Sequence, residues 1–137
     1  MTKHTERLSF DEAYATLYKD FSSLERHRVS DKIRDILVRA YTKLPKKIVK
    51  WAQENVIFIS SVKTPLACCV HKNMESWKGY KGFIFISDSV LNEPEETQNL
   101  AIAHEIAYIK KEHKSCSNDP DEDNEADALA RKWLSEG

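Results

Sequence analysis

The residues that could carry out chemistry lie in one short tract near the end of the sequence. His104 is followed directly by Glu105, and Tyr108 stands four positions after the histidine. In the motif H-E-x-x-H, two histidines one helical turn apart bind zinc, and the glutamate beside the first activates a metal-bound water. The tract HEIAY at 104–108 therefore keeps the first half of a zinc-peptidase motif and has tyrosine in place of the second histidine.

A second acidic residue could complete such a site. Glu125 lies seventeen positions after Tyr108, on a helix of its own beyond a loop, and two antiparallel helices would bring its carboxylate back to His104. The residues around His104 are strongly apolar, and a polar pair embedded in a core is unusual. The alternative is that His104 and Glu125 form a buried hydrogen-bonded pair, with Tyr108 in the core and Glu105 in solvent.

The two tracts together resemble the small zinc metallopeptidases of the gluzincin kind, in particular the bacterial and phage-associated peptidases of the ImmA/IrrE type. The resemblance covers about residues 82–134. It includes the tract EADALA at 125–130, which is similar to the Glu-Ala-x-x-x-Ala tract on the second helix of that family. Members of the family act on repressor proteins.

This resemblance implies roles for individual residues. His104 would be the first zinc ligand, Glu105 the general base and Glu125 the third protein ligand. Tyr108 stands in the place of the second histidine, where coordination by its phenolate is chemically possible. In such enzymes the strand before the helix pairs with an extended substrate, which would be GFIFIS at 82–87.

The implied function is zinc-dependent hydrolysis of peptide bonds by a metal-bound water. Zinc would be the cofactor, and the partner would be a peptide or protein substrate. The alternative belongs to a different class of protein. It is a catalytically inactive zincin-fold module that binds or regulates a partner.

Hydrophobic periodicity predicts helices at both ends of the chain and strands between them. The first expected helix covers about 10–25, a second begins near Ser30 and Asp31 ahead of a break at Pro45, and a third, shorter one ends near Asn55. The last two cover about 92–114 and 121–135, and the expected strands are 56–60, 66–71 and 82–87. Asn92 is predicted to cap the fourth helix. The short connection between the last two strands favours antiparallel pairing.

These elements predict a single α+β domain over residues 1–137. Residues 1–55 would form a helical N-terminal part, and residues 56–137 a zincin-like core. That core would contain a small three-stranded sheet followed by a two-helix metal-site region.

Composition limits the kinds of partner. Lys and Arg number 21 against 22 Asp and Glu, so a net charge of −1 gives no general attraction to nucleic acid or to a membrane. No apolar run approaches the roughly 20 residues that cross a bilayer. The cysteines are odd in number and form no CxxC pair, which predicts a reducing, cytoplasmic setting. They are Cys68, Cys69 and Cys116.

Two other histidines are weaker candidates for metal ligands. His113 lies nine positions after His104, and at about 100° per residue it falls on the opposite side of the same helix. His71 lies on an expected strand and is expected to be structural, although a strand residue facing the helix could reach a metal.

Overall fold

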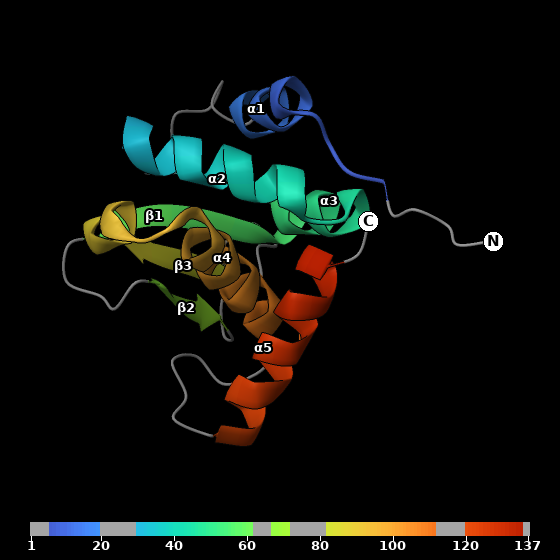
Figure 1. Ribbon diagram of the computed structural model, residues 1–137, viewed down its shortest axis with the longest axis vertical. Coiled ribbons are helices and arrows are strands. Elements are labelled where there is room, and N and C mark those ends of the chain that lie inside the picture. The colour runs from blue at the N-terminus through green and yellow to red at the C-terminus, as the bar shows by residue number, and fades with distance from the viewer. Residues whose placement is uncertain (1–5, 20–29, 62–66, 72–81, 112–119, 136–137) are drawn as a thin grey trace.

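The protein has an α+β fold, as its hydrophobic pattern predicts (Figure 1). The computed structural model describes residues 6–19, 30–61, 67–71, 82–111 and 120–135, with the backbone alone at 18–19, 61, 67–71 and 122–123. In chain order the elements over these residues are α1 (Phe10–Lys19), α2 (Asp31–Lys43), α3 (Lys46–Asn55), β1 (Val56–Ser61), β2 (Ala67–His71), β3 (Gly82–Ser87), the 3₁₀ helix η1 (Asp88–Asn92), α4 (Glu95–Lys110) and α5 (Pro120–Ser135).

The strands form one mixed sheet in the order β1-β3-β2, so β3 is the central strand. β1 runs parallel to β3, with Val56 opposite Gly82. β2 runs antiparallel to β3, with His71 opposite Gly82, as its short connection to β3 predicted. Both edges of β3 are therefore occupied. The expectation that residues 82–87 pair with an extended substrate is wrong, because their neighbours in the sheet already use those edges.

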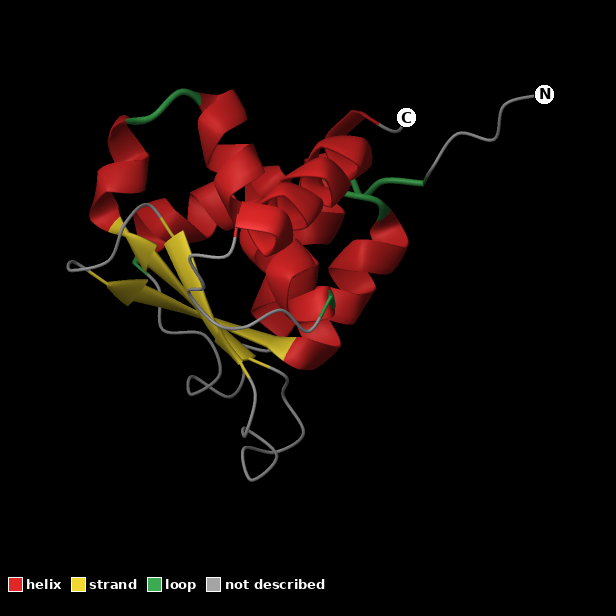
Figure 2. Ribbon diagram, turned by 90° about the horizontal axis from the view of Figure 1, so that it is seen from below, coloured by secondary structure: helices red, strands yellow, loops and turns green. Residues whose placement is uncertain are grey.

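The two faces of the sheet differ in burial. Phe58 on β1 lies opposite Ile84 on β3, and both are fully buried on the face that the helices cover (Figure 2). Phe83 and Phe85 alternate with Ile84 along β3 and are only half-buried, with their ring centroids 6.4 Å apart. The main core therefore lies between the helices and one face of the sheet.

Helix α2 is joined to both α3 and the sheet. At its start, the backbone N–H of Ile33 donates to Oγ of Ser30 at 3.3 Å, so Ser30 is the N-cap of the helix. Further along, the ring of Tyr41 meets the ring of Phe58 edge-on at 6.1 Å. The Tyr41 hydroxyl also donates to Oε1 of Gln53 on α3 at 3.0 Å. These contacts fix α2 against the rest of the core.

The helix that carries the His-Glu pair begins later than predicted. We expected Asn92 to cap it, but Asn92 ends η1, and α4 begins at Glu95 after an extended Pro94. Ser87 starts η1 by accepting a hydrogen bond from the N–H of Ser89 at 3.2 Å. The chain therefore turns helical directly after β3. Asn92 is left three residues ahead of α4, too early to act as its cap.

Helix α4 is buried on all sides near its C-terminal end. Residues 105–109 are buried without a break, and at about 100° per residue they cover its whole circumference. It packs against α5, α2 and the strands β2 and β3. Helix α5 turns Ala126, Ala130 and Trp133 into the core. Helix α4 ends at Lys110 with Lys111 as its C-cap, earlier than the predicted end near Lys114. Residues 112–114 lie outside the described residues, as does the predicted continuation of α1 beyond Lys19.

Helix α1 begins with a reciprocal cap. The backbone N–H of Ser9 donates to Oε1 of Glu12 at 2.9 Å, and the backbone N–H of Glu12 donates to Oγ of Ser9 at 3.1 Å. The backbone N–H of Ser9, and then its side chain, hold the pKa of the Glu12 carboxyl below its ordinary value, with a smaller contribution from the charge of Lys46. Ionised Glu12 therefore favours the folded start of α1.

The start of α1 is expected to lose stability in acid. The pKa of Glu12 is lower in the folded than in the unfolded chain, so ionised Glu12 stabilises the fold. This stabilisation is complete above the ordinary pKa of 4.5 and is lost as the pH falls through the lowered pKa of the folded chain. In a carbon-detected NMR titration, Glu12 should titrate below 4.5, and Ser9→Ala should raise its pKa. The control Ser135→Ala should leave the titration unchanged. An unchanged titration in Ser9→Ala would contradict the cap.

Candidate functional site

His104, Glu105 and Tyr108 are all placed by α4, and none of them is fully exposed. The side chain of His104 is 17% exposed. Glu105 is 9% exposed and Tyr108 is 4% exposed. The rings of His104 and Tyr108 lie one helical turn apart, with centroids 5.1 Å apart and planes at 43°. Tyr108 is therefore part of the core packing, and its ring lies against the imidazole.

Helix α5 brings to His104 an acidic residue to which the sequence analysis gave no role. Oδ1 of Asp127 lies 3.7 Å from Nδ1 of His104, and Oδ2 of Asp127 accepts a hydrogen bond from Nε of Arg131 at 2.8 Å. The first distance is too long for a hydrogen bond, but the groups attract each other when the imidazole is protonated. The side chains of Arg131, Asp127 and His104 are 65%, 37% and 17% exposed. They form a line from the surface inward.

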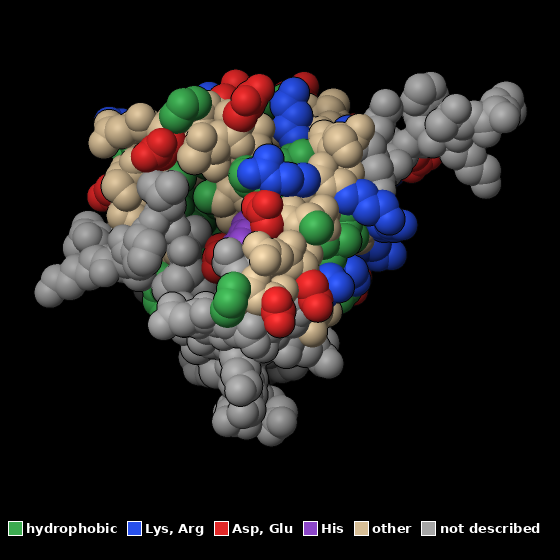
Figure 3. Space-filling model, turned by 60° about the horizontal axis from the view of Figure 1, so that its bottom comes forward, with side chains coloured by type: hydrophobic (Ala, Val, Ile, Leu, Met, Phe, Trp, Pro, Cys, Tyr) green, Lys and Arg blue, Asp and Glu red, His purple; other side chains and the backbone are tan. Residues whose placement is uncertain are grey.

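The surface over this region mixes charges of both signs. Figure 3 shows a histidine side chain that reaches the surface among acidic and basic side chains. Glu125 belongs to a separate pair, because its Oε2 lies 3.8 Å from Nζ of Lys111 and its side chain is 58% exposed. We expected Glu125 to face His104. Among the residues that the structure describes, the carboxylate within ion-pair distance of His104 is that of Asp127.

The described residues do not by themselves supply the predicted zinc centre. A protein zinc site needs at least three ligands that converge on one point. Across the described ranges of the chain, no group of three His, Cys, Asp or Glu side chains is placed to hold a metal ion. His104 and Glu125 instead face different partners. The roles of His104, Tyr108 and Glu125 as metal ligands stay predictions.

Glu105 is buried rather than solvated. The alternative that placed it in solvent is therefore wrong on this point, although it placed Tyr108 in the core correctly. A buried carboxylate is costly unless it is paired or hydrogen-bonded. Such groups are frequent at functional sites, so its position next to His104 keeps Glu105 a candidate base.

The two weaker histidine candidates and the three cysteines lie where the structure describes no side chain. His113 and Cys116 lie outside the described residues. At His71, Cys68 and Cys69 the structure describes the backbone alone. The described residues of the candidate site therefore come from α4 and α5.

Comparison with known proteins does not assign a family. No family model, no curated protein and no solved structure matches the chain. Within the described ranges, no helix is both long enough and apolar enough to span a membrane. The function must therefore be inferred from the residues of α4, α5 and their surroundings.

Proposed function

We propose that this protein is a catalytically inactive, zincin-like module that binds a partner protein. The observation that carries the proposal is that the two main predicted ligands lie against different residues. His104 faces Asp127, whereas Glu125 faces Lys111. With Tyr108 in the second histidine position, only one strong metal ligand of the H-E-x-x-H motif remains on α4, and a single imidazole is a poor zinc site.

The zincin-like part of the proposal is supported by the order of the elements around the site. The strand β3 leads through η1 into the helix with the His-Glu pair, and α5 packs against that helix. The EADALA tract lies on α5, where the resemblance places it. Compared with an H-E-x-x-H helix, α4 has the first histidine and the glutamate, and it has tyrosine in place of the second histidine.

We propose a peptide or protein as the partner, and the cytoplasm as the setting. The net charge of −1 offers no general attraction to nucleic acid or to an anionic membrane. Three cysteines without a CxxC pair suit a reducing compartment.

A working peptidase is the second candidate, and one observation favours it. Histidines that bind metals commonly turn their other ring nitrogen to a carboxylate, as His104 turns Nδ1 to Asp127. Glu105 is buried beside that histidine, where a general base would be expected.

Metal content and turnover separate the two candidates. Protein purified without chelator is expected to carry far less than one zinc per chain. With zinc supplied, it should cleave no member of a broad peptide library above a blank, as followed by mass spectrometry. Glu105→Gln should change neither result, because an inactive module does not use Glu105 as a base.

Near-stoichiometric zinc with cleavage by the unaltered chain would contradict the proposed function. If that cleavage were lost in Glu105→Gln with zinc retained, Glu105 would be the base of a working peptidase. Glu54→Gln, which alters an exposed glutamate on α3, is the matched control and should behave like the unaltered chain.

A further inference from the structure

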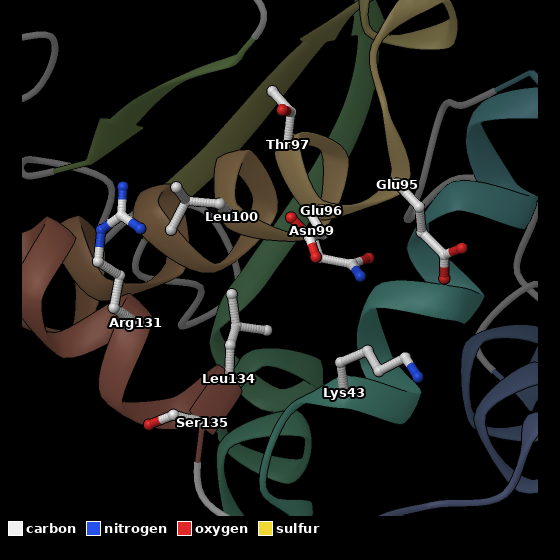
Figure 4. Close-up of a pocket in the computed structure, with 9 residues that line it drawn as sticks. All are labelled: Lys43, Glu95, Glu96, Thr97, Asn99, Leu100, Arg131, Leu134 and Ser135. Carbon is white, nitrogen blue, oxygen red and sulfur yellow. The ribbon is translucent and has the colours of Figure 1, made fainter.

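An open groove lies where the end of α2, the first turns of α4 and the end of α5 meet (Figure 4). Its volume is about 820 Å³, which lies in the range of roughly 300–1,000 Å³ typical of ligand sites. Arg131 lines the groove and also bonds to Asp127, so the groove adjoins the His104 site without including His104 itself.

The wall of the groove contains a polar side chain without a partner. Asn99 is 8% exposed, and its Oδ1 is buried with no hydrogen-bond partner. Within the part of the chain that the structure describes, the Asn99 side chain makes no hydrogen bond. Such a group normally destabilises a fold, so its presence calls for an explanation. Figure 4 shows its amide extending from α4 toward the side of Glu95 and Lys43. An amide offers both a donor and an acceptor, which matches a peptide bond.

A basic group stands elsewhere along the same groove. Nε of Arg131 is used by Asp127, and this bond holds the guanidinium in place. Its two Nη groups contact no partner among the described residues, and the side chain is 65% exposed. A guanidinium with both Nη groups available binds a carboxylate through two parallel hydrogen bonds.

An apolar surface lies between these two polar groups. Leu100 on α4 and Leu134 on α5 are both half-buried and both line the groove. In Figure 4 they lie between the guanidinium of Arg131 and the amide of Asn99. This order of groups would accept an apolar side chain flanked by an acid on one side and a backbone amide on the other.

The remaining charges on the rim argue against a polyanion. Glu95 and Glu96 line the groove together with Lys43. Their two carboxylates would repel the phosphates of a nucleic acid or of an anionic lipid surface. A polypeptide segment with a single acidic side chain among neutral amides matches this mixed rim better.

We propose that the groove binds a short, extended segment of a partner protein with an acidic side chain next to an apolar one. The acid pairs with Arg131, the apolar side chain covers Leu100 and Leu134, and a backbone amide bonds to Asn99. This inference rests on the proposed function, because it names the binding surface and the partner chemistry of the module.

The test uses synthetic peptides that are acetylated and amidated, so that their termini carry no charge. One pool has a fixed Leu-Glu pair, and a matched pool has Leu-Gln. The Leu-Glu pool is expected to shift the NMR signals of the Asn99 side-chain amide and of Arg131. It should bind more tightly than the Leu-Gln pool by about tenfold, the usual scale for a hydrogen bond to a charged group.

Variants locate the contacts. Arg131→Gln should remove the preference for Leu-Glu, and Asn99→Ala should weaken the binding of both pools by a similar factor. Lys132→Gln alters the neighbouring basic residue on α5, which does not line the groove, and should leave binding unchanged. Both test positions suit substitution without unfolding, because Arg131 is exposed and Oδ1 of Asn99 has no hydrogen-bond partner to lose among the described residues.

The proposal is overturned if the pools leave Asn99 and Arg131 unshifted, or if Lys132→Gln weakens binding as much as Arg131→Gln. Failure of the groove differs from failure of the proposed function. Peptides that bind elsewhere on the chain would overturn the groove and leave a binding function standing. Peptides that are cleaved when zinc is supplied, while still shifting Asn99 and Arg131, would support the groove and overturn the inactive module.

Discussion

Tyr108→His is expected to raise the affinity of the chain for zinc by a large factor. It restores two imidazoles one turn apart on α4, at positions whose rings already lie 5.1 Å apart. Removing a residue that only hydrogen-bonds to a metal ligand lowers metal affinity by about 10–100-fold. Adding a residue that binds the metal directly should therefore change the affinity by at least the upper end of that range. A competition titration against a coloured chelator at neutral pH measures the gain.

Two control variants separate a metal site from a surface effect. Tyr108→Phe removes the hydroxyl and adds no ligand. Lys110→His adds an imidazole to the same helix, but about 240° around the axis from His104. Both should bind zinc no better than the unaltered chain. Tyr108 is 4% exposed, so circular dichroism must show that each variant is folded. A folded Tyr108→His without any gain would contradict the zincin-like origin of this helix.

The local elements of the fold could be predicted because their signals are local. Ser30 starts α2 as a short polar cap, and the buried stripe of α5 follows the helical period. The start of α4 could not be predicted in the same way. Asn92 and Pro94 suit a helix start, but η1 uses Asn92 as its last residue. Whether a 3₁₀ turn follows a strand directly depends on how that strand is packed in its sheet, which is not a local property of the sequence.

Strand order is also a long-range property. A run such as GFIFIS shows that a strand is apolar, but both an edge strand and a central strand can have that composition. The short link between β2 and β3 constrained that pair alone. The parallel pairing of β1 with β3, which closes the second edge of β3, depends on segments far apart in the sequence.

The sequence alone could not predict which carboxylate of α5, Glu125 or Asp127, lies near His104. Both flank Ala126, at about 100° to either side on a helix, so the buried stripe of Ala126, Ala130 and Trp133 lies between them. The helical period alone therefore does not distinguish which of the two carboxylates lies near His104. The rotation of α5 against α4 distinguishes them, and in the structure it brings Oδ1 of Asp127 to 3.7 Å from Nδ1 of His104. The i,i+4 spacing of Asp127 and Arg131 was the one local sign that Asp127 is held in place.

Phe58→Ala is expected to lower the free energy of unfolding by about 3–5 kcal/mol. Phe58 is fully buried on the inner face of the sheet, opposite Ile84, and its ring meets that of Tyr41 at 66°. The substitution removes the ring and leaves a cavity that neighbouring side chains fill only in part. Because a domain is typically stable by about 5–15 kcal/mol, the variant should unfold at much lower urea concentration.

Phe10→Ala is the matched control for this loss. Phe10 is 50% exposed on α1, so the same truncation should change the free energy of unfolding by about 0.5 kcal/mol or less. Urea unfolding of both variants, followed by circular dichroism, gives the comparison. If Phe58→Ala and Phe10→Ala both lowered the free energy of unfolding by a similarly small amount, β1 would not be packed against α2. Helix α4 packs on α2 and on the same sheet, so that result would also remove the support for the placement of His104 and Asn99.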